Sequence, residues 1–578
     1  MNFDIEIQNN GRGYMACTEK VSDKDNIMII SVKLNFGKKL IPEKTVLRIG
    51  TDMTDMFSTW SPLIYYRRGL QSDMNKSVQE SRTAFGAPIK TILSADGSNR
   101  LTVAAADCKT PLRILSGIRE EDTKIYIETE FFSNPISAAE SYETLIRLDY
   151  RSIPYYDAIY DTRSWWFETN GLKTAYVPEI AKNPMYSTWY SYHQRFDADS
   201  IVKECKKAKE LGLDAIIIDD GWQTKDLHRG YAFCGDWKAE PEKVGKMREF
   251  VERIHNEGLK VILWYSVPFI GKNSAAWEKF RGKYLDSEEN SWCRLDPRFP
   301  EVRQYLTEMY KKAAQEWQLD GFKLDFIDSF ALFSESMENR EGQDISSLEE
   351  AVECLLENIM TELKKINPEI CIEFRQSYMG PIMQTYGNMI RVSDCPGDAL
   401  TNRIGSIDLR LTSGSCAVHS DMLMWNMTDS VQSAARQLIN VLFSVPQISV
   451  RLNEIPNEHW KMLKFYIKFL RENRDILLDG KLMPLNPEEN YPLVCASLDG
   501  REIAVLYGAE IYVCGNPESK VTLINCGGKD SAYIDFGKAR ADEITIYDCM
   551  GNIVNRYFAE TDGIIKLSVP VCGMAVIS

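Results

Sequence analysis

Acidic side chains at the ends of buried-type strands are the residues of this sequence best placed to do chemistry. The apolar run 215–219 ends in Asp219 and is followed by Asp220. The run 321–326 carries Asp325 near its end, and side-chain alternation places Lys323 on the same strand face. A lysine beside an aspartate favours the ionised form that a carboxylate nucleophile requires.

A third acidic segment combines an arginine within a strand, Arg391, with an aspartate at its end, Asp394. Asp398 follows a Pro-Gly turn, and we expect it to be exposed. Two carboxylates on well-separated strands are what glycoside cleavage needs, one as the nucleophile and one as general acid and then base.

Structural explanations of the same residues stay open. A solvated Asp-Gly turn would explain Asp219 and Asp220, and a structural ion pair would explain Lys323 and Asp325. Asp328 is a competing candidate for the nucleophile, although it lies beyond the strand.

The elements that must position these residues alternate between short apolar runs and longer segments of helical period. This rhythm predicts a (β/α)8 barrel, in which reactive groups sit at the C-terminal ends of the strands. The strand candidates are residues 186–192, 215–219, 260–265, 321–326, 370–374, 389–393, 417–419 and 447–450.

Short runs of alternating apolar and polar residues, or of β-branched residues, flank the barrel on both sides. Such runs are typical of all-β domains. We therefore predict a multidomain chain with an N-terminal β-sandwich over residues 1–180. The catalytic (β/α)8 TIM barrel is expected over 181–477, and a C-terminal all-β domain, also a β-sandwich, over 478–578.

Composition narrows the classes of function. The chain has 578 residues, 44% of them hydrophobic and 26% charged, as in folded globular proteins. A net charge of −15 repels nucleic-acid phosphates and anionic membranes. No apolar run approaches the about 20 residues of a bilayer span, and the first residues lack a signal-peptide pattern. We expect a cytoplasmic protein with neither nucleic acid nor a membrane as a partner.

Cysteine and histidine give no sign of a metal centre. The 14 Cys include no C-x-x-C pair, and the five His form neither an H-x-H nor an H-E-x-x-H arrangement. Neither a zinc cluster nor a disulfide framework is indicated. The chemistry is therefore expected to use carboxylates.

The motifs resemble those of glycoside hydrolase family 36, which contains α-galactosidases, some α-N-acetylgalactosaminidases and raffinose-type galactosyltransferases. The matching segments are I-I-D-D-G-W at 217–222, G-D-W at 235–237, H-N-E-G-L-K-V-I-L-W at 255–264, D-G-F-K-L-D at 320–325 and R-V-S-D at 391–394. They occur in the order and approximate spacing of the family. The resemblance implies a retaining glycosidase that needs no metal or organic cofactor.

Carried over residue by residue, the resemblance implies Asp325 as the nucleophile and Asp394 as the acid/base. Asp219 and Asp220 would bind O4 and O6 of the sugar. Further contacts with hydroxyl groups and the walls of the pocket would come from Lys323, Arg391, Trp189 and Trp264.

The sequence departs from the family pattern at three places, two of which are loops that frame the O2 side of the sugar in the family. Leu324 replaces the tryptophan of the usual K-W-D. Relatives carry Cys or Ser followed by glycines where residues 373–378 read E-F-R-Q-S-Y, so Glu373 and Arg375 become candidate substrate-binding residues. The usual S-D-N-T-D-A has become S-D-C-P-G-D-A at 393–399. Residues 419–422 either line the same pocket or form a solvated turn.

We therefore expect a retaining α-glycosidase, in the first place an α-galactosidase, acting on an oligosaccharide or glycoside by double displacement. A transglycosylase, or an α-glycosidase for another sugar such as α-N-acetylgalactosamine, would use the same site. A non-catalytic carbohydrate-binding protein is the alternative from another class. A divalent-metal hydrolase using Asp219, Asp220 and Asp325 is a further one. A homo-oligomer is left open.

Overall fold

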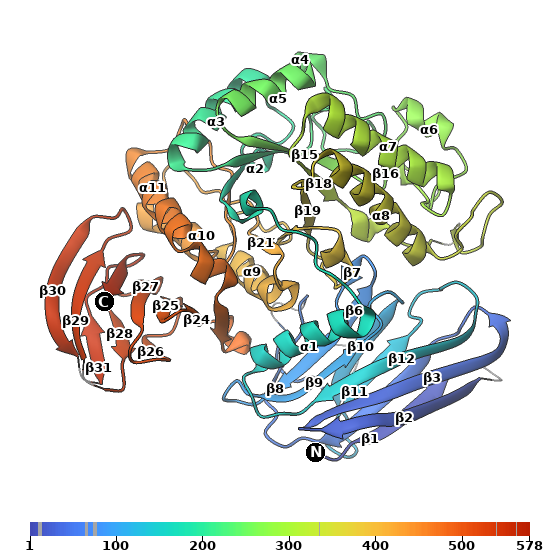
Figure 1. Ribbon diagram of the computed structural model, residues 1–578, viewed down its shortest axis with the longest axis horizontal. Coiled ribbons are helices and arrows are strands. Elements are labelled where there is room, and N and C mark those ends of the chain that lie inside the picture. Colours follow the sequence, from blue (N-terminus) through green and yellow to red (C-terminus); the bar gives the residue numbers. More distant parts are fainter. Residues whose placement is uncertain (10–13, 64–66, 73–77, 334–335, 539, 562) are drawn as a thin grey trace.

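The computed structural model describes the whole chain except residues 10–13, 64–66, 73–77, 334–335, 539 and 562. Figure 1 shows the N-terminal sheets in blue below the barrel and the C-terminal sheets in red at its side. The predicted order of β-sandwich, barrel and all-β domain is confirmed. The domain boundaries at residues 180 and 477 stay a prediction.

Two six-stranded sheets form the N-terminal sandwich, in the orders β1-β4-β11-β10-β6-β7 and β2-β3-β12-β9-β8-β5. Alternating apolar residues such as Ile30, Val32 and Leu34 fill the core between the sheets. The strands are β1 Asp4–Asn9, β2 Met15–Lys24, β3 Ile27–Leu40, β4 Thr45–Asp52, β5 Ser58–Trp60, β6 Val78–Arg82, β7 Phe85–Gly86, β8 Ile89–Leu93, β9 Asn99–Ala105, β10 Leu112–Ile118, β11 Lys124–Phe131 and β12 Ala139–Asp149.

The expectation of β-structure alone up to residue 180 is wrong, because helix α1 (Tyr155–Asn170) follows the last strand. Pro154 precedes the helix, and Gly171 ends it in the left-handed conformation. The buried residues Tyr155, Ile159 and Trp166 fall on one face of the helix. Helix α1 thus lies between the sandwich and the barrel (Figure 1).

Eight parallel strands form the barrel in the order β21-β20-β19-β18-β15-β14-β13-β22. A parallel bridge between His419 and Val445 nearly closes the ring between β21 and β22. The strands are β13 Met185–Ser187, β14 Ala215–Ile218, β15 Lys260–Ser266, β18 Gly321–Asp325, β19 Cys371–Arg375, β20 Met389–Arg391, β21 Ala417–His419 and β22 Gln447–Ile448. The first prediction, residues 186–192, was too long, because its second half forms the short helix α2 (Trp189–Tyr192).

Helices cover the outside of the barrel (Figure 1). Side chains cap the N-termini of several of them, such as Asp197 for α3 and Ser347 for α8. These helices are α3 Ala198–Leu211, α4 Pro241–Val244, α5 Met247–Asn256, α6 Ala275–Lys279, α7 Pro300–Trp317, α8 Leu348–Ile366, α9 Ala399–Ser413, α10 Val431–Ile439 and α11 Asn457–Glu472. In a βα loop, β16 (Phe269–Gly271) pairs with β17 (Trp292–Arg294).

Strand β18 is oriented so that its polar residues point into the barrel. Phe322 makes an edge contact with Tyr310 of α7 at 5.6 Å between ring centroids, and therefore faces the helices. Gly321 allows the strand to approach its neighbour closely, since a Cβ at this position would lie 2.5 Å from the carbonyl oxygen of Cys371. Lys323 and Asp325, on the opposite face, are turned toward the barrel axis.

The C-terminal region has a seven-stranded and a three-stranded sheet around a second sandwich core. Its strands are β23 Lys481–Leu485, β24 Leu493–Leu498, β25 Arg501–Leu506, β26 Ile511–Val513, β27 Lys520–Asn525, β28 Ala532–Asp535, β29 Arg540–Tyr547, β30 Ile553–Thr561, β31 Ile564–Leu567 and β32 Met574–Ile577. Among the described residues, no helix has both the length and the apolar character that crossing a membrane requires.

A buried network joins the three regions around Asp408 of α9. The Asp408 carboxylate accepts hydrogen bonds from Trp60 Nε1 at 3.0 Å, from Arg68 Nη2 at 2.7 Å and from the hydroxyl of Tyr491. Trp60 and Arg68 belong to the N-terminal region, and Tyr491 comes after β23. We call these four residues the junction network.

The β6–β7 hairpin of the sandwich touches the loops that follow β18 and β19. Arg82 donates to the carbonyl oxygens of Phe330 and Asp328, both at 2.7 Å. The backbone N–H of Gly86 donates to the carbonyl of Ser377 at 2.8 Å. A Cβ on Gly380 would lie 2.6 Å from the Gly86 carbonyl oxygen, so the two backbones are in close contact.

Candidate active site

Asp325 is the last residue of β18, and four groups donate hydrogen bonds to its carboxylate. Oδ1 accepts from Arg375 Nε at 2.7 Å, from the Phe326 backbone N–H at 2.8 Å and from the Tyr378 hydroxyl at 3.1 Å. Oδ2 accepts from the indole N–H of Trp264 at 3.0 Å. Burial acts to raise the pKa of Asp325, but nearby positive charge, above all Arg375, outweighs it and holds the pKa well below its usual range. Asp325 is therefore ionised.

Lys323 does not form the direct pair with Asp325 that a structural ion pair would require. Its Nζ instead contacts Asp219 Oδ2 at 2.6 Å, and both side chains are buried. Its charge still helps to lower the pKa of Asp325 through space. Lys323 of β18 therefore pairs with a carboxylate at the end of β14 and also favours the ionised form of the candidate nucleophile.

Asp219 and Asp220 are buried, with exposed fractions of 2% and 4%, so the alternative of a solvated turn is wrong. Asp220 accepts one hydrogen bond on each oxygen, from Gln194 Nε2 and Gln223 Nε2, both at 2.7 Å. Burial raises the pKa of Asp220 to about 6. The two glutamines fix the orientation of this carboxylate.

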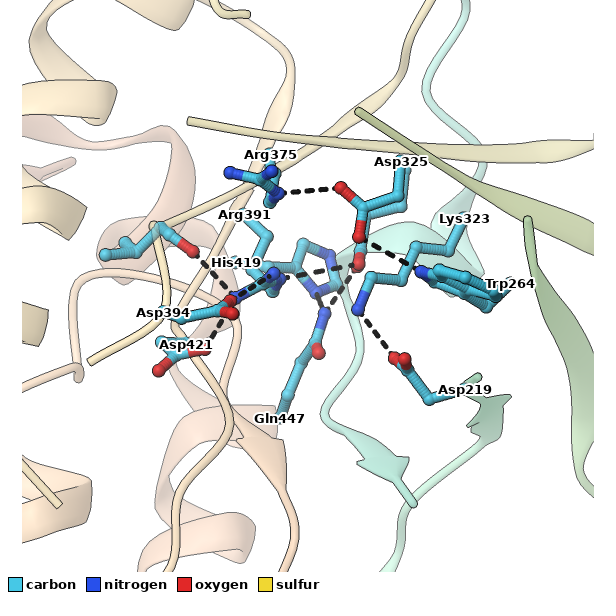
Figure 2. Close-up of polar contacts among 12 residues, drawn as sticks. Asp219, Trp264, Lys323, Asp325, Arg375, Arg391, Asp394, His419, Asp421 and Gln447 are labelled. Atoms are coloured by element: carbon cyan, nitrogen blue, oxygen red, sulfur yellow. Dashed lines mark hydrogen bonds and ion pairs between the residues drawn. The ribbon is translucent and has the colours of Figure 1, made fainter. Parts of the chain in front are cut away.

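Asp394 lies beyond β20 and is held by Arg391, whose Nη2 donates to Asp394 Oδ1 at 2.9 Å (Figure 2). The Asp394 side chain is 53% exposed, whereas that of Arg391 is 1% exposed. Burial acts to raise the pKa of Asp394, but the charges of Arg391 and Lys323 outweigh it and lower the pKa. Asp398 is exposed and caps α9, accepting from the Thr401 backbone N–H, as expected for a turn residue.

Arg391 also binds Asp421, which the sequence indicated only as part of the segment 419–422. Arg391 Nη1 donates to Asp421 Oδ1 at 2.5 Å, and the Tyr190 hydroxyl donates to Oδ2 at 2.8 Å. Residues 419–422 are buried, so their interpretation as a solvated turn is wrong. The signal was present in the sequence, because Asp421 comes just after an apolar strand.

A polar layer lies beneath these residues inside the barrel. Gln447 Nε2 donates to Glu373 Oε2 at 2.5 Å and lies 3.2 Å from His419 Nδ1. Glu373 is fully buried, and burial raises its pKa to about 7. Glu373 Oε1, Arg391 Nε and Gln447 Oε1 have no hydrogen-bond partner. Glu373 Oε1 and Arg391 Nε lie 3.8 Å apart as an ion pair.

The remaining candidates lie near the barrel mouth in different settings. Trp264 contacts Asp325 directly, as described above. Trp189 begins α2, and the guanidinium of Arg229 lies 5.3 Å from its ring centroid. Asp328 accepts from the Ser377 hydroxyl at 3.1 Å, and burial raises its pKa. Asp328 is thus held less firmly in its ionised form than Asp325.

Two carboxylates that differ in their exposure to solvent lie at one end of the barrel. Asp325 is 6% exposed and ionised, while Asp394 is half exposed and lies after β20 (Figure 2). Figure 2 also shows Asp219, Lys323 and Trp264 turned toward the same region as these two residues. Such a set can supply a nucleophile, a proton donor and hydroxyl ligands to a sugar. Within the part of the chain that the structure describes, no three His, Cys, Asp or Glu form a metal-binding group.

Curated relatives match the chain over part of its length. The bifunctional α-galactosidase/sucrose kinase AgaSK of Mediterraneibacter gnavus is 24% identical over 227 residues, which are 38% of this chain and 23% of that protein. The α-galactosidase Mel36A of Lactobacillus acidophilus is 26% identical over 153 residues, 25% of this chain and 20% of that protein. The matches therefore span less than a quarter of either relative.

Solved structures share the fold over nearly the whole chain. The GH36 α-galactosidase AgaA of Geobacillus stearothermophilus gives a TM-score of 0.62 at 13% identity, covering 96% of this chain and 79% of that one. The α-galactosidase of Lactobacillus brevis gives 0.64 at 13% identity, covering 100% and 85%. AgaA variants have been solved in complex with stachyose and with raffinose.

The family assignment comes from the barrel. The sequence profile of the melibiase family matches residues 174–480, which is more than half of the 578 residues. The matched segment contains every candidate residue described above. The chain belongs to the melibiase family.

Proposed function

We propose that this protein is a retaining α-galactosidase that removes terminal α-linked galactose from oligosaccharides by double displacement. The observation that carries the proposal is the pairing of a buried, ionised Asp325 with a half-exposed Asp394 at the same end of the barrel. The α-galactosidase relatives and the AgaA complexes with raffinose and stachyose support the choice of sugar.

In this proposal Asp325 attacks the anomeric carbon while Asp394 protonates the departing oxygen. The charge of Asp325 acts to raise the pKa of Asp394 and so opposes the lowering by Arg391 and Lys323. A bound sugar also removes water from Asp394, which acts in the same direction. Once Asp325 becomes a neutral ester, that charge is gone, and Asp394 can take a proton from the attacking water.

Recognition of the sugar is assigned to Asp219 and Asp220, as ligands of O4 and O6. Two buried carboxylates in fixed orientations favour an axial over an equatorial 4-OH, because the wrong epimer leaves their lone pairs unpaired. Further contacts are assigned to Lys323, Arg391, Trp189 and Trp264, whereas Arg375, which binds Asp325, acts on the sugar through that carboxylate. Glu373 lies beneath Arg391 and acts on the sugar through it.

A panel of p-nitrophenyl glycosides tests this proposal. We expect the α-galactoside to be cleaved at least about 100-fold faster than the α-glucoside. The α-N-acetylgalactosaminide tests the space around O2. In proton NMR, α-galactose should be the first product. Release of the β-anomer, or preference for the α-glucoside, would contradict the proposal.

Other expectations accompany this function. A reaction carried by two carboxylates requires no metal or cofactor, so activity should survive EDTA, whereas a metal-dependent hydrolase would lose it. An added acceptor sugar distinguishes transglycosylation from hydrolysis. The cytoplasmic location and the homo-oligomer stay predictions.

A further inference from the structure

The two oxygens of Asp325 have unequal hydrogen bonding. Oδ1 receives the Arg375 guanidinium, the Tyr378 hydroxyl and the Phe326 N–H, whereas Oδ2 receives the Trp264 indole alone. A carboxylate oxygen has two lone pairs in the plane of the group. The donors therefore occupy Oδ1 fully and leave one lone pair of Oδ2 available.

We propose that Oδ2 of Asp325 forms the bond to the sugar, and that Arg375 makes this carboxylate a better leaving group, so that release of the glycosyl-enzyme is fast. The inference rests on the proposed function and goes beyond it by assigning the reacting atom and the role of Arg375. Arg375 acts through Asp325 and is a positioning residue.

The electron balance shows why the two halves of the reaction respond in opposite ways. In the first half, an Oδ2 lone pair bonds to the anomeric carbon, and the electrons of the broken bond go to the leaving oxygen, which takes the proton of Asp394. Oδ1 becomes an ester carbonyl and loses most of its negative charge. In the second half, water attacks the carbon and gives its proton to Asp394, and the electrons of the C–Oδ2 bond return to the carboxylate.

Arg375 therefore stabilises the two states in which Asp325 carries a charge more than the ester between them. Charge-assisted hydrogen bonds are about twice as strong as neutral ones. Compared with an Asp325 that lacks Arg375, the carboxylate therefore attacks the sugar more slowly, and the glycosyl-enzyme releases the sugar faster.

The surroundings of Arg375 keep the guanidinium in place. Arg375 ends β19, beside β18, and its Nη1 donates to the carbonyl of Gln376 at 3.0 Å. Its guanidinium lies 5.0 Å from the ring centroid of Phe326 and 5.7 Å from that of Tyr378. Its side chain is 18% exposed. The contact with Asp325 is thus held from several sides.

Rapid-quench kinetics with p-nitrophenyl α-galactoside test the role of Arg375. We expect no burst of nitrophenol for the wild type. Arg375→Met should show a burst approaching one equivalent, with release of the sugar slowed about 10- to 100-fold. Both kcat and KM should fall because release of the sugar limits turnover. kcat/KM, which reports formation of the glycosyl-enzyme, should be equal to that of the wild type or higher, because attack then begins from a carboxylate that is less stabilised.

Two conservative variants separate electrostatics from damage to the site. Arg375→Lys keeps a charge and should suppress the burst, and Tyr378→Phe should show a smaller burst than Arg375→Met. A parallel loss of kcat and kcat/KM in Arg375→Met without a burst, or a burst in Arg375→Lys equal to that of Arg375→Met, would overturn the inference.

A crystal structure of the enzyme trapped with 5-fluoro-α-galactosyl fluoride tests the reacting atom. The anomeric carbon should be bonded to the oxygen next to Trp264 Nε1, and a bond to the oxygen beside Arg375 would overturn the assignment. A wild type that cleaves no α-glycoside would refute the proposed function and the inference together. An active wild type with the wrong burst pattern would refute the inference alone.

Discussion

The junction network and the candidate active site are both buried clusters of carboxylates and arginines. They differ in whether all their polar atoms have hydrogen-bond partners. At the junction, Arg68, Tyr491 and Trp60 all donate to Asp408, and no atom of these side chains lacks a partner. In the site, atoms of Glu373, Arg391 and Gln447 do lack hydrogen-bond partners.

This is the difference that we expect between a structural cluster and a binding site. A buried polar group without a hydrogen bond costs stability, so a cluster with no other role is expected to be completed by the protein itself. The incomplete layer of the site lies directly below the side chains assigned to the sugar. Four substitutions test whether this comparison holds.

Asp325→Ala should remove nearly all hydrolysis of α-galactosides, at least about 10⁴-fold in kcat, because no other group can form the glycosyl-enzyme. The melting temperature should stay close to that of the wild type. Asp328→Ala is the matched control and should remain active. If Asp328→Ala is inactive and Asp325→Ala active, the assignment of the nucleophile is wrong.

Asp394→Ala should lose about 10²- to 10⁴-fold in kcat/KM on raffinose, because its sugar leaving group needs a proton. The loss on an aryl galactoside with a good leaving group should be much smaller. Steady-state kinetics on both substrates measure the ratio. Equal losses would indicate a structural role for Asp394 or would favour Asp398.

Asp408→Ala should destabilise the protein by about 3–5 kcal/mol, because it leaves the buried Arg68 without its carboxylate. Molecules that remain folded should keep their kcat. Urea unfolding and active-site titration give the two values. Asp398→Ala, on the exposed start of the same helix, is the control and should cost about 1 kcal/mol. If both variants lose a similar free energy of unfolding, Asp408 contributes no more to stability than an exposed helix cap.

Glu373→Gln should change the pH dependence of stability. The pKa of Glu373 is about 7 in the folded protein against a usual 4.5. The wild type therefore loses stability as the pH rises from about 4.5 through 7, by about 3 kcal/mol from this residue. The variant should be more stable than the wild type at pH 8 and similar at pH 5. If the variant and the wild type differ in stability by the same amount at pH 5 and pH 8, Glu373 does not titrate in this range.

The sequence predicted the fold well because local patterns determine it. The eight apolar runs correspond to the eight barrel strands, and residues 348–366 form α8 as the helical period indicated. Helix α1 was missed because aromatic residues, which have low helix propensity, crowd its sequence. Its helical spacing and Gly171 were the signals that could have identified it.

The sequence indicated which carboxylates lie together at one end of the barrel, but not how the side chains pair; their roles stay a prediction. Positions at strand ends identified Asp219, Asp325 and Asp394, since parallel strands bring these ends together. The partner of Lys323 depends on side-chain directions across the barrel, which spacing along the chain does not encode. The contact of Arg375 with Asp325 is likewise a property of neighbouring strands.

The close contact between Gly86 and Gly380 has a consequence for how this protein can be recombined with a relative. The hairpin of the sandwich supports the loop that begins at Arg375, through backbone atoms at a spacing that leaves no room for a side chain on Gly380. A chimaera that joins this barrel to the sandwich of a relative must therefore inherit the hairpin and the loop as one block. A crossover point between them would combine a hairpin and a loop from different proteins, and their backbones would not be matched to this close contact.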